Sequence, residues 1–156
     1  MMITKRIMKR LSNLETEKFT PVLWRLKQTL RYEMTRTFVS ETNLGITWTK
    51  QTNGKWEASE TTNLTVPEGF ITDGVRSPRS LAWVCSPMGG RYAEAAVLHD
   101  YLYSPMCERS LSRKQCDKYF YGAMRADGVG LVKAWAMYLS VRFFGGKFFK
   151  RSLYGK

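Results

Sequence analysis

The chain is poor in the residues that build most metal and disulfide sites, with one histidine and three cysteines among 156 residues. The cysteines, Cys85, Cys107 and Cys116, are odd in number and include no C-x-x-C pair. This argues against a disulfide framework and against a four-thiolate zinc site, so we expect reduced thiols. For Cys107 and Cys116 two roles remain open: small buried apolar residues, or metal or redox groups.

Long apolar runs are also missing. No stretch approaches the ~20 apolar residues of a membrane-spanning helix, and the N-terminus lacks the continuous apolar segment of a secretion signal. The sequence therefore predicts neither a transmembrane helix nor a signal peptide.

Acidic residues are scarce, because 13 Asp and Glu stand against 25 Lys and Arg, giving a formal net charge of +12. Such a positive field attracts nucleic-acid phosphates, lipid headgroups or an acidic protein, without choosing among them. The chain is 44% hydrophobic, enough for an ordinary core. We expect a single globular domain over residues 1–156.

The N-terminal segment, residues 1–19, places Ile3, Ile7 and Leu11 at helical spacing, with lysines and arginines between them. This pattern predicts a basic amphipathic arm in helical form. Two roles fit the arm equally well: docking on a membrane surface or a partner, or covering the core of its own domain.

Residues 20–66 are rich in Thr, Val, Ile, Trp and Tyr in loose alternation, which predicts a small antiparallel sheet. Asn53-Gly54 tolerates positive φ and predicts a tight turn between Trp48 and Trp56.

The second half is punctuated by glycine and proline. We expect an irregular loop over residues 69–87 and helices over residues 92–103, 112–126 and 130–144, followed by a solvated basic tail at 147–156. The short connection between the first two helices makes them antiparallel neighbours. The predicted fold class is α+β, with the sheet of the first half packed on the three-helix C-terminal half.

The one histidine, His99, stands beside Asp100 on the first of these helices, with Tyr103 one turn later. Asp117 on the antiparallel helix can lie opposite His99, accept a hydrogen bond from the imidazole and fix its tautomer. Tyr103 is placed to donate its hydroxyl to Asp117. The alternatives are a surface charge for Asp117, paired with a neighbouring cation, and simple packing for Tyr103.

Asp100 points about a quarter-turn from His99 and is a candidate ligand for a cation. The loop that carries Asp73 is the best candidate to complete such a site, and hard oxygen ligands from a loop favour calcium. For Asp73 a turn-forming role before Gly74 is at least as good an interpretation.

Four motifs resemble an uncharacterised family of small phage-encoded proteins with a domain of unknown function. They are G-F-I-T-D-G at 69–74, S-P-R at 77–79, A-A-V-L-H-D-Y-L-Y at 95–103 and S-R-x-x-x-D-x-x-F at 112–120. The resemblance implies a phage or prophage origin, with synthesis in the host cytoplasm and, as one option, a place in the virion. It implies no activity.

More distantly, H-D-Y-L-Y followed by R-x-x-x-D-x-x-F-Y-x-x-M resembles the two-helix core of the phospholipase A₂ superfamily. That resemblance implies His99 as general base, Asp117 as its orienting partner and Tyr103 as the supporting hydroxyl. It also implies Asp100 and Asp73 as calcium ligands. The chain departs from the pattern by lacking the flanking cysteine pair and the glycine-rich calcium loop.

Three functions follow. The first is a phage-encoded hydrolase that attacks a lipid ester by phospholipase A₂-like chemistry, with the positive surface favouring anionic membranes. The second is a non-catalytic virion or accessory protein that binds DNA, other phage proteins or an acidic partner. The third is an inhibitor of a host enzyme. Aromatic residues of the third helix are either core or a stacking surface for single-stranded nucleic acid.

Overall fold

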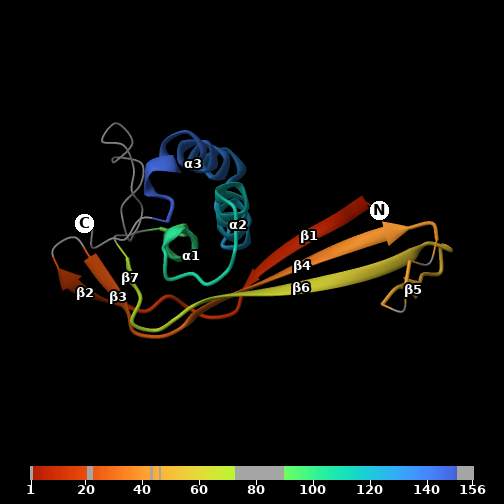
Figure 1. Ribbon diagram of the computed structural model, residues 1–156, viewed down its shortest axis with the longest axis horizontal. Coiled ribbons are helices and arrows are strands. Elements are labelled where there is room, and N and C mark those ends of the chain that lie inside the picture. The colour runs from red at the N-terminus through yellow and green to blue at the C-terminus, as the bar shows by residue number, and fades with distance from the viewer. Residues whose placement is uncertain (1, 21–22, 43, 46, 73–89, 151–156) are drawn as a thin grey trace.

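The computed structural model describes residues 2–20, 23–42, 44–45, 47–72 and 90–150. Within them the first half forms two small antiparallel sheets and the second half forms three α-helices. Figure 1 shows the helices stacked on one side of the strands. The predicted α+β class is confirmed. No helix in this described part is long and apolar enough to cross a membrane.

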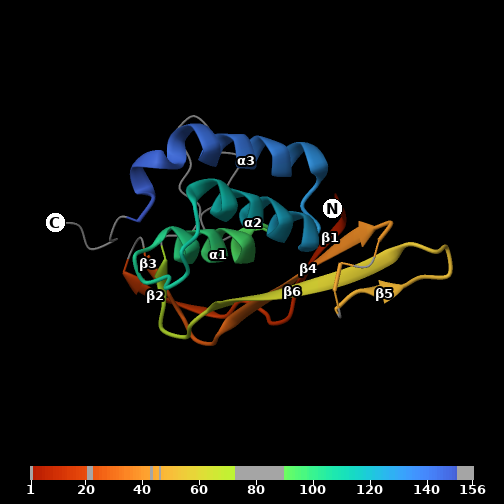
Figure 2. The same ribbon diagram turned by 45° about the vertical axis from the view of Figure 1, so that its right-hand side comes forward.

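The larger sheet has the strand order β1-β4-β6-β5. Its centre is the pair β4 (Leu30–Ser40) and β6 (Trp56–Val66), in a register that sets Leu30 opposite Val66. Both residues are fully buried, as is Tyr32, because alternate side chains of a strand share one face. The end of this pair that holds Leu30 and Val66, its proximal end, therefore lies under the helices. The distal end, where Ser40 pairs with Trp56, projects beyond them (Figures 1 and 2).

The tight turn predicted at Asn53-Gly54 is confirmed. The short β5 (Thr49–Lys50) pairs with the start of β6, so that Lys50 lies opposite Trp56. Gly54 takes a φ of +80°, in the left-handed region that residues with a Cβ rarely adopt. This turn lies at the distal end of the projecting ribbon (Figure 2).

The second sheet has the order β2-β3-β7, formed by Thr16–Thr20, Leu23–Leu26 and Ile71–Thr72. In it Trp24 pairs with Thr72. The position of β7 matters for the site, because Thr72 is fully buried and contacts the first helix.

The helix predicted over residues 1–19 is wrong, since the segment forms β1 (Met2–Arg10) and β2 instead. Ile3 and Ile7 are four residues apart, a spacing that puts side chains on one face of a regular helix and also of a regular strand, so it does not distinguish the two. In β1 itself the register shifts between Ile3 and Lys5. Pairing along the length of β4 decides for the strand. Ile3 and Ile7 are exposed, while Met8 packs against the core.

The three predicted helices are confirmed as α1 (Ala93–Tyr103), α2 (Arg113–Ala126) and α3 (Leu131–Phe144). Ser112 caps α2: its hydroxyl accepts from the Gln115 backbone N–H, and the Gln115 side chain accepts from the Ser112 backbone N–H. α1 and α2 form the expected antiparallel hairpin (Figure 2).

Gly122 lets α2 approach β1. A Cβ at this position would meet Met8 Sδ at 3.1 Å, so a larger residue would require the Met8 side chain to shift by a few tenths of an ångström. The close approach joins the N-terminal strand to the helical half.

The predicted solvated tail is wrong for residues 148–150, whereas Lys147 is exposed as expected. After α3 a 3₁₀ helix runs over Gly145–Phe148, and both Phe148 and Phe149 pack against the core. The Lys150 backbone N–H donates to the Tyr103 carbonyl at 2.5 Å. Apolar burial of the two phenylalanines outweighs solvation of the neighbouring cations. Residues 151–156 lie outside the described residues.

Candidate active site

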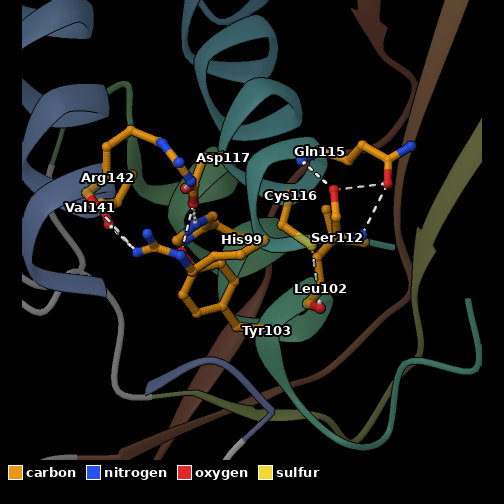
Figure 3. A network of polar contacts seen from close by, with 10 residues as sticks. His99, Leu102, Tyr103, Ser112, Gln115, Cys116, Asp117, Val141 and Arg142 are labelled. Carbon is orange, nitrogen blue, oxygen red and sulfur yellow. Dashed lines mark hydrogen bonds and ion pairs between the residues drawn. The ribbon is translucent and has the colours of Figure 1, made fainter. Parts of the chain in front are cut away.

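The site is built on the hairpin of α1 and α2, which brings His99 and Asp117 together. His99 Nε2 lies 2.9 Å from Asp117 Oδ1 (Figure 3). His99 is 8% exposed and Asp117 is fully buried. The predicted pairing of these two residues is thus present in the structure. The alternative of a surface charge for Asp117 is wrong.

Two further side chains donate to the same carboxylate. The Tyr103 hydroxyl donates to Oδ1 at 2.6 Å, as the sequence predicted. The Arg142 guanidinium donates to Oδ2 at 2.7 Å. Burial alone would raise the pKa of Asp117, but the hydrogen bonds from His99, Tyr103 and Arg142 outweigh it and hold the pKa below its ordinary value. Asp117 is therefore ionised at neutral pH.

The ionised carboxylate fixes the tautomer of His99. A carboxylate can only accept, so Nε2 carries the hydrogen. Burial lowers the pKa of His99, against the opposing effect of Asp117, so the ring is neutral at pH 7. A neutral ring with hydrogen on Nε2 has a lone pair on Nδ1, which forms no hydrogen bond with any described residue. His99 thus has the protonation state of a general base.

Aromatic packing holds the imidazole in place. The His99 ring centroid lies 4.1 Å from that of Tyr103 and 4.7 Å from that of Phe120. Behind Tyr103, a Cβ on Gly145 would meet the phenol oxygen at 2.9 Å, so glycine is required for this close approach. These contacts fix the ring orientation that the hydrogen bond to Asp117 needs.

Sequence reasoning missed the role of Arg142. Arg142 lies in the last turn of that helix. Arg113 of α2 donates to the Arg142 carbonyl at 3.1 Å and so holds this turn against α2. The signal available in the sequence was weak: an arginine at a helix C-terminus is ordinary, because it suits the helix dipole there.

The residues assigned to a cation are only partly described. Asp100 is half-buried, and its Oδ2 accepts a hydrogen bond from Thr72 Oγ1 at 2.6 Å. Asp73, which follows Thr72 in the chain, lies outside the described residues. Among the residues that are described, no group of three or more His, Cys, Asp or Glu could hold a metal ion. The calcium site therefore stays a prediction.

The two described cysteines are buried, in agreement with their interpretation as small apolar residues. The Cys116 thiol contacts the Leu102 carbonyl, with Sγ 3.6 Å from the oxygen. Burial raises the pKa of Cys116 to about 12, so the thiolate form is suppressed. Cys85 lies outside the described residues.

Comparison with known proteins places the chain in a family without assigning it an activity. Residues 48–141 match the family described as "Protein of unknown function (DUF1353)", and the chain belongs to this family. It is 39% identical over 83 residues to the "Uncharacterized protein y4jT" of Sinorhizobium fredii (strain NBRC 101917 / NGR234). The alignment covers 51% of this chain but only 23% of that relative. No solved structure matches the chain.

Proposed function

Within this family of unknown function, we propose that the chain is a hydrolase in which His99 activates water for attack on a lipid ester, by phospholipase A₂-like chemistry. One observation carries the proposal. A buried, ionised Asp117 accepts the hydrogen of His99 Nε2 and leaves the Nδ1 lone pair available to take a proton.

In the proposed step, Nδ1 removes a proton from water while the water oxygen bonds to the ester carbonyl carbon. The resulting imidazolium then gives that proton to the leaving alkoxide as the carbon–oxygen ester bond breaks. Asp117 stabilises the imidazolium across the 2.9 Å contact. Tyr103 and Arg142 keep Asp117 charged, so that it orients His99 and does not take up the proton itself.

Asp100 fits a hard cation in its donor type and its placement. It is the carboxylate directly after the proposed base, it is half-buried, and Thr72 already orients one of its oxygens. We propose that Asp100, with Asp73, holds calcium. A bound calcium ion would polarise the ester carbonyl and stabilise the developing negative charge.

The activity is tested by fatty-acid release from mixed-phospholipid vesicles. His99→Ala should lower the rate by roughly 10²–10⁴-fold, the usual contribution of a general base. Circular dichroism and thermal unfolding show whether the variant keeps its fold. Release by a folded His99→Ala chain at the wild-type rate would reject the assigned base.

The cation is tested separately by following thermal unfolding during a calcium titration. A specific site stabilises the native state by mass action, so the wild-type midpoint should rise and the Asp100→Ala midpoint should not. An equal rise in both proteins, or no rise in the wild type, would remove Asp100 as a ligand.

We further propose a phage or prophage origin and synthesis in a host cytoplasm. The motif resemblance at residues 69–74, 95–103 and 112–120 supports this origin. If a folded wild-type chain releases no fatty acid under any calcium condition, the non-catalytic virion or accessory role replaces the hydrolase.

A further inference from the structure

The outer face of α3 exposes an apolar surface. Val132 is 83% exposed and Phe143 is 78% exposed. Leu131, Trp135 and Leu139, which lie on the same side of the helix, are about half exposed, and Phe144 at its end is 59% exposed on another side. At about 100° per residue, the five side chains other than Phe144 fall within an arc of about 120°. We call this arc the outer face of α3.

The outer face lies on the side of α3 opposite the buried residues of that helix. α3 is the outermost layer, stacked on α2 on the side remote from the strands (Figure 2). Its core contacts come from its other side, where Ala134 and Met137 are buried. Trp135 is anchored at the edge by ring contacts with Tyr121 and Tyr138, at 5.2 and 5.5 Å.

The stretch of sequence that contains this face carries charge of one sign. From residue 128 to residue 156 the sequence contains no Asp or Glu. It contains Lys and Arg at positions 133, 142, 147, 150, 151 and 156. Arg142 is engaged with Asp117, but Lys147 in the 3₁₀ helix is exposed directly after the exposed aromatic end of α3.

We propose that the outer face of α3 is a docking surface for an anionic phospholipid membrane, with the helix lying in the plane of the headgroups. Aliphatic and aromatic side chains on one face of a helix enter the acyl boundary, while neighbouring lysines meet lipid phosphates. The absence of carboxylates over this stretch removes the repulsion that an anionic surface would otherwise meet.

Docking here is separate from the membrane contact that was one of the two roles open for residues 1–19. It rests on the proposed function in one respect, since it supplies the surface on which lipid esters would be met. The last turn of α3 joins the two, because Arg142 binds Asp117 while Phe143 beside it is exposed.

The test uses the full chain and vesicles of ether-linked phospholipids, which hold no carboxylic ester for the proposed reaction to hydrolyse. Sedimentation compares phosphatidylcholine vesicles with an equal mixture of phosphatidylcholine and phosphatidylglycerol. The wild type should bind the anionic vesicles more tightly, and salt should weaken binding. The double variant Val132→Ser/Phe143→Ser should lose affinity by roughly a hundredfold, since two large apolar side chains no longer insert.

The matched control is Leu44→Ser/Met106→Ser, which removes two apolar side chains of 54% and 60% exposure outside α3. It should bind like the wild type. The proposal is overturned if the wild type does not bind anionic vesicles, if the α3 variant binds as well as the wild type, or if the control loses as much affinity as the α3 variant. If the chain self-associates through the outer face of α3 and binds no vesicles, the face belongs to an interface with a second copy, and the proposal is also overturned.

Failure of docking and failure of hydrolysis are separable. Vesicle binding by a chain that hydrolyses no lipid ester would leave the docking surface standing and reject the proposed function. Hydrolysis of a dispersed short-chain ester by a chain that binds no vesicle would support the proposed function and reject the docking surface.

Discussion

Two buried aspartates on α2 make the sharpest comparison in this molecule. Asp117 lies in the second turn of the helix and Asp127 is its C-cap residue. Their side chains are 0% and 3% exposed. Each accepts a tyrosine hydroxyl, from Tyr103 at 2.6 Å and from Tyr32 at 2.5 Å. Only Asp117 also accepts from a histidine, His99.

The pKa values of the two carboxyls nevertheless move in opposite directions. Arg142 donates to Asp117 at 2.7 Å, whereas Arg10 lies 3.3 Å from Asp127 and also pairs with Glu94. Burial, with the nearby Glu94, raises the pKa of Asp127 to about 6 despite Tyr32 and Arg10. The pKa of Asp117 stays low. Equal burial thus gives a fixed charge at one position and a titrating group at the other, and close donors decide which.

The largest difference between the two aspartates is expected in the stability that is lost when each is replaced by alanine. Asp117→Ala leaves the His99 ring N–H, the Tyr103 hydroxyl and the Arg142 guanidinium without their acceptor. The free energy of unfolding should fall by about 3–5 kcal/mol in urea titrations at pH 7. Asp127→Ala is the matched variant and should cost less. An equal loss of unfolding free energy in Asp127→Ala and Asp117→Ala would contradict this expectation.

Lowering the pH should change the contributions of Asp127 and Asp117 to stability in opposite directions. The folded pKa of Asp127, about 6, exceeds the ordinary value of about 3.9 for an unfolded chain, so its stabilising contribution is full below about pH 4 and is lost as pH rises through about 6. Lowering the pH from about 7.5 to about 4.5 should therefore raise the stability of the wild type relative to Asp127→Asn by about 2 kcal/mol.

His99 and Asp117 contribute in the other direction, because their pKa values are lowered by folding. Their contribution is present above the ordinary values and lost as pH falls. Urea titrations of wild type and Asp127→Asn at four pH values measure the difference, in which the His99 and Asp117 contributions cancel. A difference that stays constant with pH would show that Asp127 does not titrate in this window.

A single hydroxyl should have a smaller effect. Tyr103→Phe removes one of the three donors to Asp117 and should lower the free energy of unfolding by about 1.5 kcal/mol, the lower end for a hydrogen bond to a charged group. The pKa of Asp117 should rise, so acid unfolding should begin at a higher pH. Acid unfolding at the wild-type pH would mean that Arg142 and His99 alone hold Asp117 ionised.

The smallest expected effect is at the start of α2. Ser112→Ala removes the side-chain cap and should cost about 1 kcal/mol by thermal or urea unfolding. Ser110→Ala, at an exposed serine two residues earlier, is the matched control and should cost nothing measurable. A larger loss in the control would show that the connection, not the cap, sets the start of the helix.

The sequence was most informative where interactions are local. The helix limits followed from Ser112 and from Gly130, because capping depends on residues within one turn. The contact of His99 with Asp117 followed from the short connection between α1 and α2, which makes the helices antiparallel neighbours and lets Asp117 lie opposite His99. Tyr103 followed from its position one turn after His99.

Long-range packing was not predictable in the same way. Arg142 reaches Asp117 across 25 residues because α3 packs on α2, and Tyr32 reaches Asp127 across 95. Neither distance leaves a periodic signal in one sequence. The N-terminal strand was missed for a different reason: a spacing of four residues fits both helix and strand, and only pairing with β4 distinguishes them.

Cys116 offers a native probe of how often the hairpin of α1 and α2 opens. Its thiol lies in the closed interface of α1 and α2, against the Leu102 carbonyl, and its pKa of about 12 keeps it protonated. Alkylating reagents attack only an accessible thiolate. Cys116 can therefore be modified only when the two helices separate. The rate of its modification, followed by mass spectrometry, reports how often the interface that joins His99 to Asp117 opens.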